Sequence, residues 1–177
     1  MIRPMQLGDA GAVAALLRRV FGALTLDPPS SALQETEATM LAHLERGGGF
    51  VAGPDLAGCV LWAEKAGALY LGRLAVSPAA RGRGVAAALV GAVEQEARRR
   101  GLPRVHLGVR LALEGNRRLF TRLGFTETAQ HAHPGHTVFT TVDAEKWLTA
   151  SPSGTGTPPG SPGAPPPAAP SSGRSQG

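Results

Sequence analysis

Residues 69–101 constrain the fold of this chain most, because two apolar segments of different period flank a glycine-rich turn there. The apolar run over 69–76 ends at a Ser-Pro pair, which predicts a β-strand. Apolar residues recur at helical spacing over 85–93, before three arginines and a glycine, which predicts a helix. Glu94 and Glu96 each precede an arginine by four residues, a spacing that favours ion pairs within that helix.

The turn between this strand and this helix, residues 81–86 with sequence RGRGVA, predicts an anion site. The first backbone N–H groups of a helix have no partner inside the helix, and the helix dipole attracts negative charge to them. The two glycines let a ligand approach the backbone, and Arg81 and Arg83 add positive charge. The sequence therefore predicts a turn that binds a pyrophosphate.

The composition predicts one domain in a reducing compartment. A chain of 177 residues can build one substantial core, and we place the domain at residues 1–149. The single cysteine excludes an internal disulfide, so we expect a cytoplasmic location. We find no signal peptide and no apolar run of bilayer-spanning length, so we expect no membrane partner.

Charge and aromatic content argue against a nucleic-acid partner. The net charge is +5, but the arginines are scattered or grouped at a helix end, and aromatic residues make up only 5% of the chain, which is too few for base stacking.

Residues 150–177 are rich in proline, glycine, serine and alanine, and Arg174 is their only charge. That segment cannot bury enough apolar surface to offset its ordering entropy, so it is predicted to be a disordered tail.

The remaining pattern predicts alternating helices and strands. The expected strands are 1–5, 50–52, 59–63, 104–110, 125–130 and 137–142. The expected helices are 10–22 after Asp9, 31–44 from a capping box at its start to the glycines at 47–49, 116–123, and a last turn at 144–148.

Two motifs resemble a known family. Residues 73–86 (RLAVSPAARGRGVA) resemble the acyl-CoA signature R/Q-x-x-G-x-G/A of the GNAT superfamily of N-acetyltransferases, with Arg81, Gly84 and Ala86 at its defined positions. Residues 116–125 (NRRLFTRLGF) resemble the second segment of that family, a helix that begins with asparagine and ends in Leu-Gly-Phe. Two motifs in this order are stronger support than either alone.

The resemblance implies a fold and a co-substrate. The fold would be mixed α/β (α+β) in three layers, with helices on both faces of a central, mostly antiparallel sheet that splays at the CoA-binding strand. Acetyl-CoA would be the co-substrate, with its pyrophosphate on the turn and its pantetheine arm along the strand. The cofactor-binding residues would be Leu74, Ala75, Val76, Arg81, Gly82, Arg83, Gly84, Val85, Ala86, Asn116 and Phe120.

The resemblance also implies the reaction. A primary amine would attack the thioester directly while a main-chain N–H near Val76 polarises the acetyl carbonyl. The acceptor would be a small-molecule or peptide amine, and the protein a monomer or homodimer. The chain departs from the family at Phe120, where many members have a tyrosine proposed as general acid, and at residues 71–73, which lack a glutamate base. Asn116 lies closer to Gly124 than its family counterpart, so it is either a ligand contact or a helix cap.

Three residues are candidate general bases, each with a structural alternative. Glu35 would border the acceptor site or lie on a solvated helix face. Glu64 would act through water or be a hairpin-edge charge, and His106 would titrate near neutral pH or be a buried strand residue.

The other titratable residues carry weaker signals. His131, His133 and His136 are spaced too loosely for zinc and have no cysteine partner, so we expect no metal and place them in the acceptor pocket or in solvent. Cys59 alternates with apolar residues and is predicted to lie in the core.

Two other function classes share features with this sequence. An acyl-CoA-binding sensor with the same fold and little turnover would tolerate the missing acid and base. A dinucleotide-dependent oxidoreductase would use the pattern G-x-G-x-x-A at 82–87, but four residues separate the strand from these glycines and no acidic residue follows at the expected spacing. We therefore predict an N-acetyltransferase and keep the sensor as the alternative.

Overall fold

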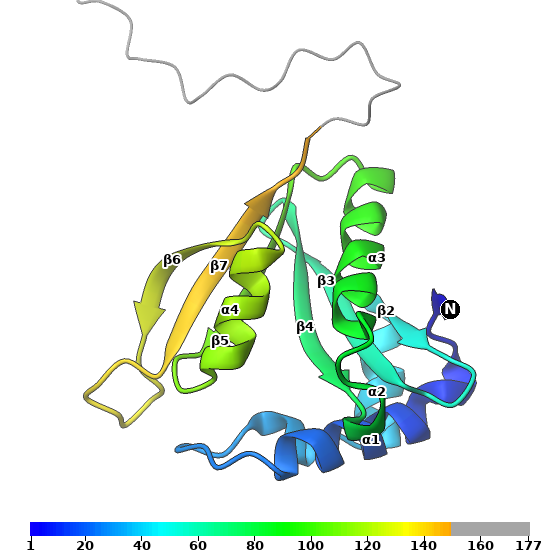
Figure 1. Ribbon diagram of the computed structural model, residues 1–177, viewed down its shortest axis with the longest axis horizontal. Helices are drawn as coiled ribbons and strands as arrows, with labels where there is room; N and C mark the ends of the chain where they lie inside the picture. The colour runs from blue at the N-terminus through cyan, green and yellow to red at the C-terminus, as the bar shows by residue number, and fades with distance from the viewer. Residues whose placement is uncertain (150–177) are drawn as a thin grey trace, which may run out of the picture.

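The computed structural model describes residues 1–149, so the predicted tail at 150–177 lies outside the described part. The described residues form a sheet in the strand order β1-β2-β3-β4-β5-β7-β6, with helices on both faces (Figure 1). This confirms the predicted mixed α/β architecture. The strands are β1 (Ile2–Pro4), β2 (Gly47–Ala52), β3 (Gly58–Lys65), β4 (Ala68–Val76), β5 (Arg104–Arg110), β6 (Thr126–His131) and β7 (Thr141–Trp147). The α-helices are α1 (Ala10–Gly22), α2 (Glu37–Leu44), α3 (Val85–Arg99) and α4 (Glu114–Arg122).

The sheet splays between β4 and β5. These neighbours run parallel, whereas the other neighbouring strands in the described sheet are antiparallel. They pair at Leu69↔Val105 and Tyr70↔His106 and then diverge toward their carboxyl ends (Figure 1). The sheet is therefore mostly antiparallel and open beside the strand that the sequence predicted.

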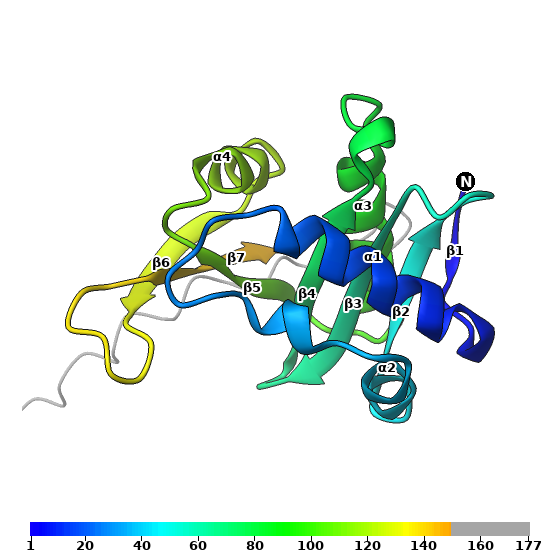
Figure 2. The same cartoon turned by 90° about the horizontal axis from the view of Figure 1, so that it is seen from below.

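Each face of the sheet has its own core. On one face, α3 and α4 cover β4, β5 and β7, and Figure 2 shows these two helices on the same side of the sheet. That core contains Leu69, Leu89, Val90, Val93, Val105, Leu107, Phe120 and Val142. On the other face, α1 and α2 cover β2, β3 and the end of β4. That second core contains Val13, Leu16, Leu17, Met40, Val51, Cys59, Leu61 and Ala75.

The predicted helix at 31–44 is wrong in its first part. Residues Ser31–Gln34 form a single 3-10 turn that the Ser30 hydroxyl caps, and Glu35 is extended. A reciprocal capping box between Thr36 and Thr39 then starts α2. Local capping by two separate hydroxyl residues therefore divides what the pattern predicts as one helix.

The glycines at 47–49 begin β2 instead of ending a helix. They pair with residues 61–63 of β3, and a methyl group on Gly48 would lie only 2.3 Å from the Trp62 indole. Glycine is therefore required by close packing across the strand pair.

The end of the domain also differs from the prediction. Residues 144–147 belong to β7, which pairs with β5 over its whole length, and residues 137–140 lie outside any strand. Val142 and Ala144 are buried while Thr141, Asp143 and Glu145 are not, which is strand periodicity. Long-range pairing with β5 therefore overrides the local helical propensity. None of the described helices is long and apolar enough to cross a bilayer.

The packing of α3 generates a stability prediction. Leu89 is fully buried between α3 and the sheet, so Leu89→Ala should lower the free energy of unfolding by about 2–5 kcal/mol because it leaves a cavity. The matched control is Leu7→Ala, whose side chain is 67% exposed and which should change the value by less than about 0.5 kcal/mol. Urea denaturation measures both, and equal effects would contradict the assigned core.

Candidate active site

The turn before α3 presents free backbone N–H groups. Gly84 is the N-cap residue with φ +75°, and Gly82 has φ +79°, so both adopt a conformation that favours glycine. The first bond of the helix joins the Ala88 N–H to the Gly84 carbonyl at 3.0 Å. Within residues 1–149, no carbonyl accepts the N–H groups of 83–86. A methyl group on either glycine would meet nothing within 4 Å, so the space beside this part of the turn is open. Free N–H groups at a helix start can bind an anion.

A β-bulge interrupts β4 directly beside the splay. Ala75 pairs with Cys59 and Gly72 pairs with Leu61, so β4 carries one extra residue between these two pairs. Arg73, within the bulge, has φ +53°, which is uncommon for a residue with a side chain. Beyond Tyr70, the β5 side of β4 has no strand partner in the described part of the chain, so its backbone groups there are free to bind a ligand.

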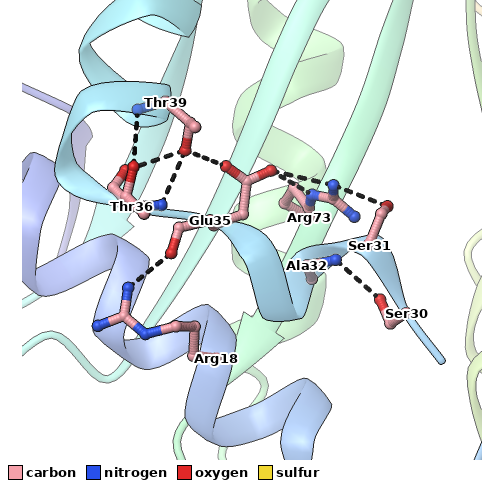
Figure 3. A network of polar contacts seen from close by, with 8 residues as sticks. All are labelled: Arg18, Ser30, Ser31, Ala32, Glu35, Thr36, Thr39 and Arg73. Carbon is pink, nitrogen blue, oxygen red and sulfur yellow. Dashed lines mark hydrogen bonds and ion pairs between the residues drawn. The ribbon is translucent and has the colours of Figure 1, made fainter.

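A polar network joins this bulge to the segment before α2 (Figure 3). Arg73 donates to Glu35 Oε1 from Nε at 3.1 Å and from Nη2 at 3.0 Å, and Nη2 also donates to the Ser31 hydroxyl at 3.0 Å. Thr39 Oγ1 donates to Glu35 Oε2 at 2.5 Å, and Arg18 donates to the Glu35 carbonyl at 2.6 Å. Both carboxylate oxygens of Glu35 are therefore engaged, which favours a positioning role over proton transfer.

The other two candidate bases lie in different surroundings. The Glu64 carboxylate is half-exposed and lies 3.4 Å from Arg100, on the side of the β4–β5 pairing where the strands stay together. His106 lies at the last β4–β5 pair, with its ring edge against Tyr70 at a centroid distance of 5.1 Å. Burial and the nearby Arg104 charge lower the pKa of His106, so its imidazole is neutral at pH 7.

A second set of polar groups lies on the sheet face opposite α3, and the sequence pattern did not identify it. Gly108 is exposed there, and a methyl group on it would lie 3.7 Å from the Tyr70 hydroxyl and 3.8 Å from Asp143 Oδ1. Asp143 Oδ2 is 2.6 Å from His131 Nε2. Alternation along β7 would have placed Asp143 on this face, but only once the strand had been recognised.

The loop between β6 and β7 holds His133 and His136. His133 contacts the Thr140 hydroxyl and the ring of His136. Partial desolvation and the charges of Arg110 and His136 lower the pKa of His133. Residues 1–149 contain no group of three or more histidine, cysteine or acidic side chains arranged to hold a metal ion.

The second sequence motif forms α4 beside the gap. Asn116 is exposed in the first turn of α4, but Leu113 is the N-cap residue, so the interpretation of Asn116 as the cap is wrong. Phe120 is 6% exposed and packs edge-on against Phe125 with the ring centroids 5.6 Å apart. Cys59 is fully buried as predicted, and burial raises the pKa of its thiol to about 12.

Two hollows on the described surface lie away from the gap. One, of about 570 Å³, lies between α4 and β6 and is lined by Arg117, Arg118 and Arg122 among others. The other, of about 670 Å³, lies beside β2 against the end of α3. Neither includes the turn at 81–86, which is an open surface bounded by backbone.

The chain belongs to the GNAT acetyltransferase family, because the model of that family matches residues 14–125. This range contains both motifs, the free N–H groups and the splayed strands. No curated protein sequence matches the chain significantly.

Solved structures share its fold at low sequence identity. The ribosomal-protein-S18-alanine N-acetyltransferase of Escherichia coli has a TM-score of 0.67 at 20% identity, over 85% of this chain and 95% of that one. A Salmonella typhimurium protein solved with acetyl-CoA has a TM-score of 0.65 at 20% identity, over 85% and 95% of the two chains. A nourseothricin acetyltransferase has a TM-score of 0.64 at 23% identity, over 83% and 97%.

The network around the bulge generates a second prediction. A double-mutant cycle of Glu35→Ala and Arg73→Ala should give a coupling energy of about 1–3 kcal/mol, because both groups are largely shielded from water. The same cycle on Glu114 and Arg118, whose side chains are 73% and 72% exposed, should give at most about 0.5 kcal/mol. Urea denaturation measures both cycles, and a coupling at Glu35 and Arg73 no larger than the control would contradict the network.

Proposed function

We propose that this protein transfers the acetyl group of acetyl-CoA to a primary amine by direct attack. One observation supports this proposal: the free N–H groups at 83–86 lie next to the edge of β4 that has no strand partner in the described part of the chain. The first suits a pyrophosphate, and the second suits an extended pantetheine arm. The residues present fit acetyl-CoA, since nothing in the described part of the chain fills the space above the two glycines of the turn.

The individual roles follow from these positions. The N–H groups of 83–86, with Arg81 and Arg83 beside them, would hold the pyrophosphate. The backbone of residues 74–76 would pair with the pantetheine arm, and a main-chain N–H near Val76 would polarise the acetyl carbonyl. Asn116 and Phe120 on α4 would flank the arm.

The chemistry requires no covalent enzyme intermediate. The amine nitrogen forms a bond to the acetyl carbon, the C–S bond breaks, and the electron pair leaves with sulfur as the CoA thiolate. Phe120 has no proton to donate, but a thiol has a pKa of about 8.5, so the thiolate leaves readily and water can protonate it. The acceptor is a small-molecule or peptide amine, and we expect the protein to act in the cytoplasm as a monomer or homodimer.

Substitution of Gly84 tests the pyrophosphate site. Gly84→Glu should weaken acetyl-CoA binding by at least about 100-fold, because a carboxylate would repel the phosphates at the free N–H groups. Gly84→Asn is the matched control, since asparagine tolerates a positive φ and adds no charge. Titration calorimetry measures both, and a folded Gly84→Glu protein with unchanged affinity would contradict the site.

A free-thiol assay with acetyl-CoA and a panel of primary amines tests the reaction. We expect thiol release that depends on the amine. The protein itself should give no signal before it unfolds, because its single cysteine is buried with a pKa of about 12. Acetyl-CoA binding without thiol release from any amine would overturn acetyl transfer and favour the sensor.

A further inference from the structure

Two glycines lie at the mouth of the splay on the face opposite α3. The last β4–β5 pair is Tyr70↔His106, and two residues further along their strands lie Gly72 and Gly108. Residues two apart on a strand point to the same face, so both glycines lie on the face of Tyr70 and His106. Gly108 therefore exposes bare backbone where the strands begin to separate, whereas the Tyr70 ring lies 3.4 Å from a methyl group built on Gly72.

A carboxylate borders this bare area. Asp143 lies opposite Gly108 in the β5–β7 register, and its Oδ1 would be 3.8 Å from a methyl group built on Gly108. Oδ2 is 2.6 Å from His131 Nε2, and no described residue donates to Oδ1. The Asp143 side chain is 47% exposed, so Oδ1 is accessible from the space above Gly108.

The other carboxylates nearby are held by arginines. Glu145 is on the same strand and face as Asp143, but it lies 3.3 Å from Arg104. Glu127 on β6 pairs with Ala144 and so faces the α4 side of the sheet, where it lies 2.8 Å from Arg117. Of the two carboxylates on this face of β7, Asp143 is therefore the one that has no arginine or lysine partner within the described residues and still has a free oxygen.

We propose that Asp143 binds the acceptor amine above Gly108 and accepts its proton, which makes the acceptor a cationic primary amine. This inference rests on the proposed function: the turn and α3 lie on one face, so a CoA that starts there and passes between β4 and β5 brings its acetyl end to the opposite face. The ammonium ion of the acceptor is attracted to Asp143 Oδ1, and the Tyr70 hydroxyl bounds the other side of the space.

The proposed step uses the carboxylate of Asp143 and water. The bound ammonium ion passes one proton to Asp143 Oδ1, and the neutral amine nitrogen then attacks the acetyl carbon. The C–S bond breaks, CoA leaves as the thiolate, and the second proton lost by nitrogen passes through water to that thiolate. The contact of His131 with Oδ2 keeps the carboxylate in place. Gly108 is the residue whose missing side chain leaves room for the amine.

Steady-state kinetics of Asp143→Asn and Gly108→Val test the inference, with alkylamines, linear diamines and amino-acid amides as acceptors. Asp143→Asn should lower kcat/KM for the amine by ~100-fold. Gly108→Val should raise KM for the amine by ~10-fold or more because it fills the space, and Gly108→Ala should have a smaller effect. Calorimetric affinity for acetyl-CoA should stay within about twofold in each variant, which also reports that the variants fold.

Glu145→Gln is the matched control, because this carboxylate lies on the same face of β7 but is held by Arg104. Its kcat/KM should stay within about threefold of the wild type. An Asp143→Asn enzyme with wild-type kcat/KM, or a Glu145→Gln enzyme that loses as much, overturns this inference while acetyl transfer stands. A wild type that releases no thiol with any amine overturns acetyl transfer itself.

Discussion

Pairing between β4 and β5 ends after two residue pairs, and this early separation opens the sheet beside the turn at 81–86. Buried backbone groups normally pair, and parallel neighbours in one sheet would ordinarily continue to do so. Here the strands part after Tyr70 and His106, although both continue for several residues. The edge of β4 beyond Tyr70 therefore has no strand partner among residues 1–149, and an extended ligand can supply the same hydrogen bonds as a strand.

Packing on the two faces maintains the separation. α3 and α4 share one core on the same face and lie on either side of the diverging strands (Figure 1). On the opposite face, Arg73 holds the bulge of β4 against Glu35 through two hydrogen bonds (Figure 3). A strained residue at φ +53° persists where its surroundings over-determine it, and this ion pair is such a restraint.

The sequence predicted those parts whose cause is local. The turn at 81–86 has its own chemical signature in glycine and arginine, and β5 shows plain alternation of buried Val105, Leu107 and Val109. The sequence failed where distant partners decide. Glu94 was expected to pair with Arg98 four residues away, yet it lies 2.7 Å from Lys146 of β7. Residues 144–147 have helical propensity, but β5 makes them a strand.

The same distinction between local and long-range causes applies to the candidate site. The free N–H groups at 83–86 follow from the start of a helix, so one segment of sequence suffices to predict them. The groups around Gly108 come from β4, β5, β6 and β7, and only the sheet order brings them together. Asp143 belongs to no sequence motif. Its proposed role depends on Gly108 opposite it and on the finding that no arginine among the described residues pairs with it.

Backbone amide NMR during titration with acetyl-CoA shows which N–H groups bind the co-substrate. We predict large shifts and slowed exchange for the N–H groups of 83–86 and of β4 beyond Tyr70, with little change in the arginine-lined hollow between α4 and β6. Shifts concentrated at Arg117, Arg118 and Arg122, with the N–H groups of 83–86 unchanged, would contradict it.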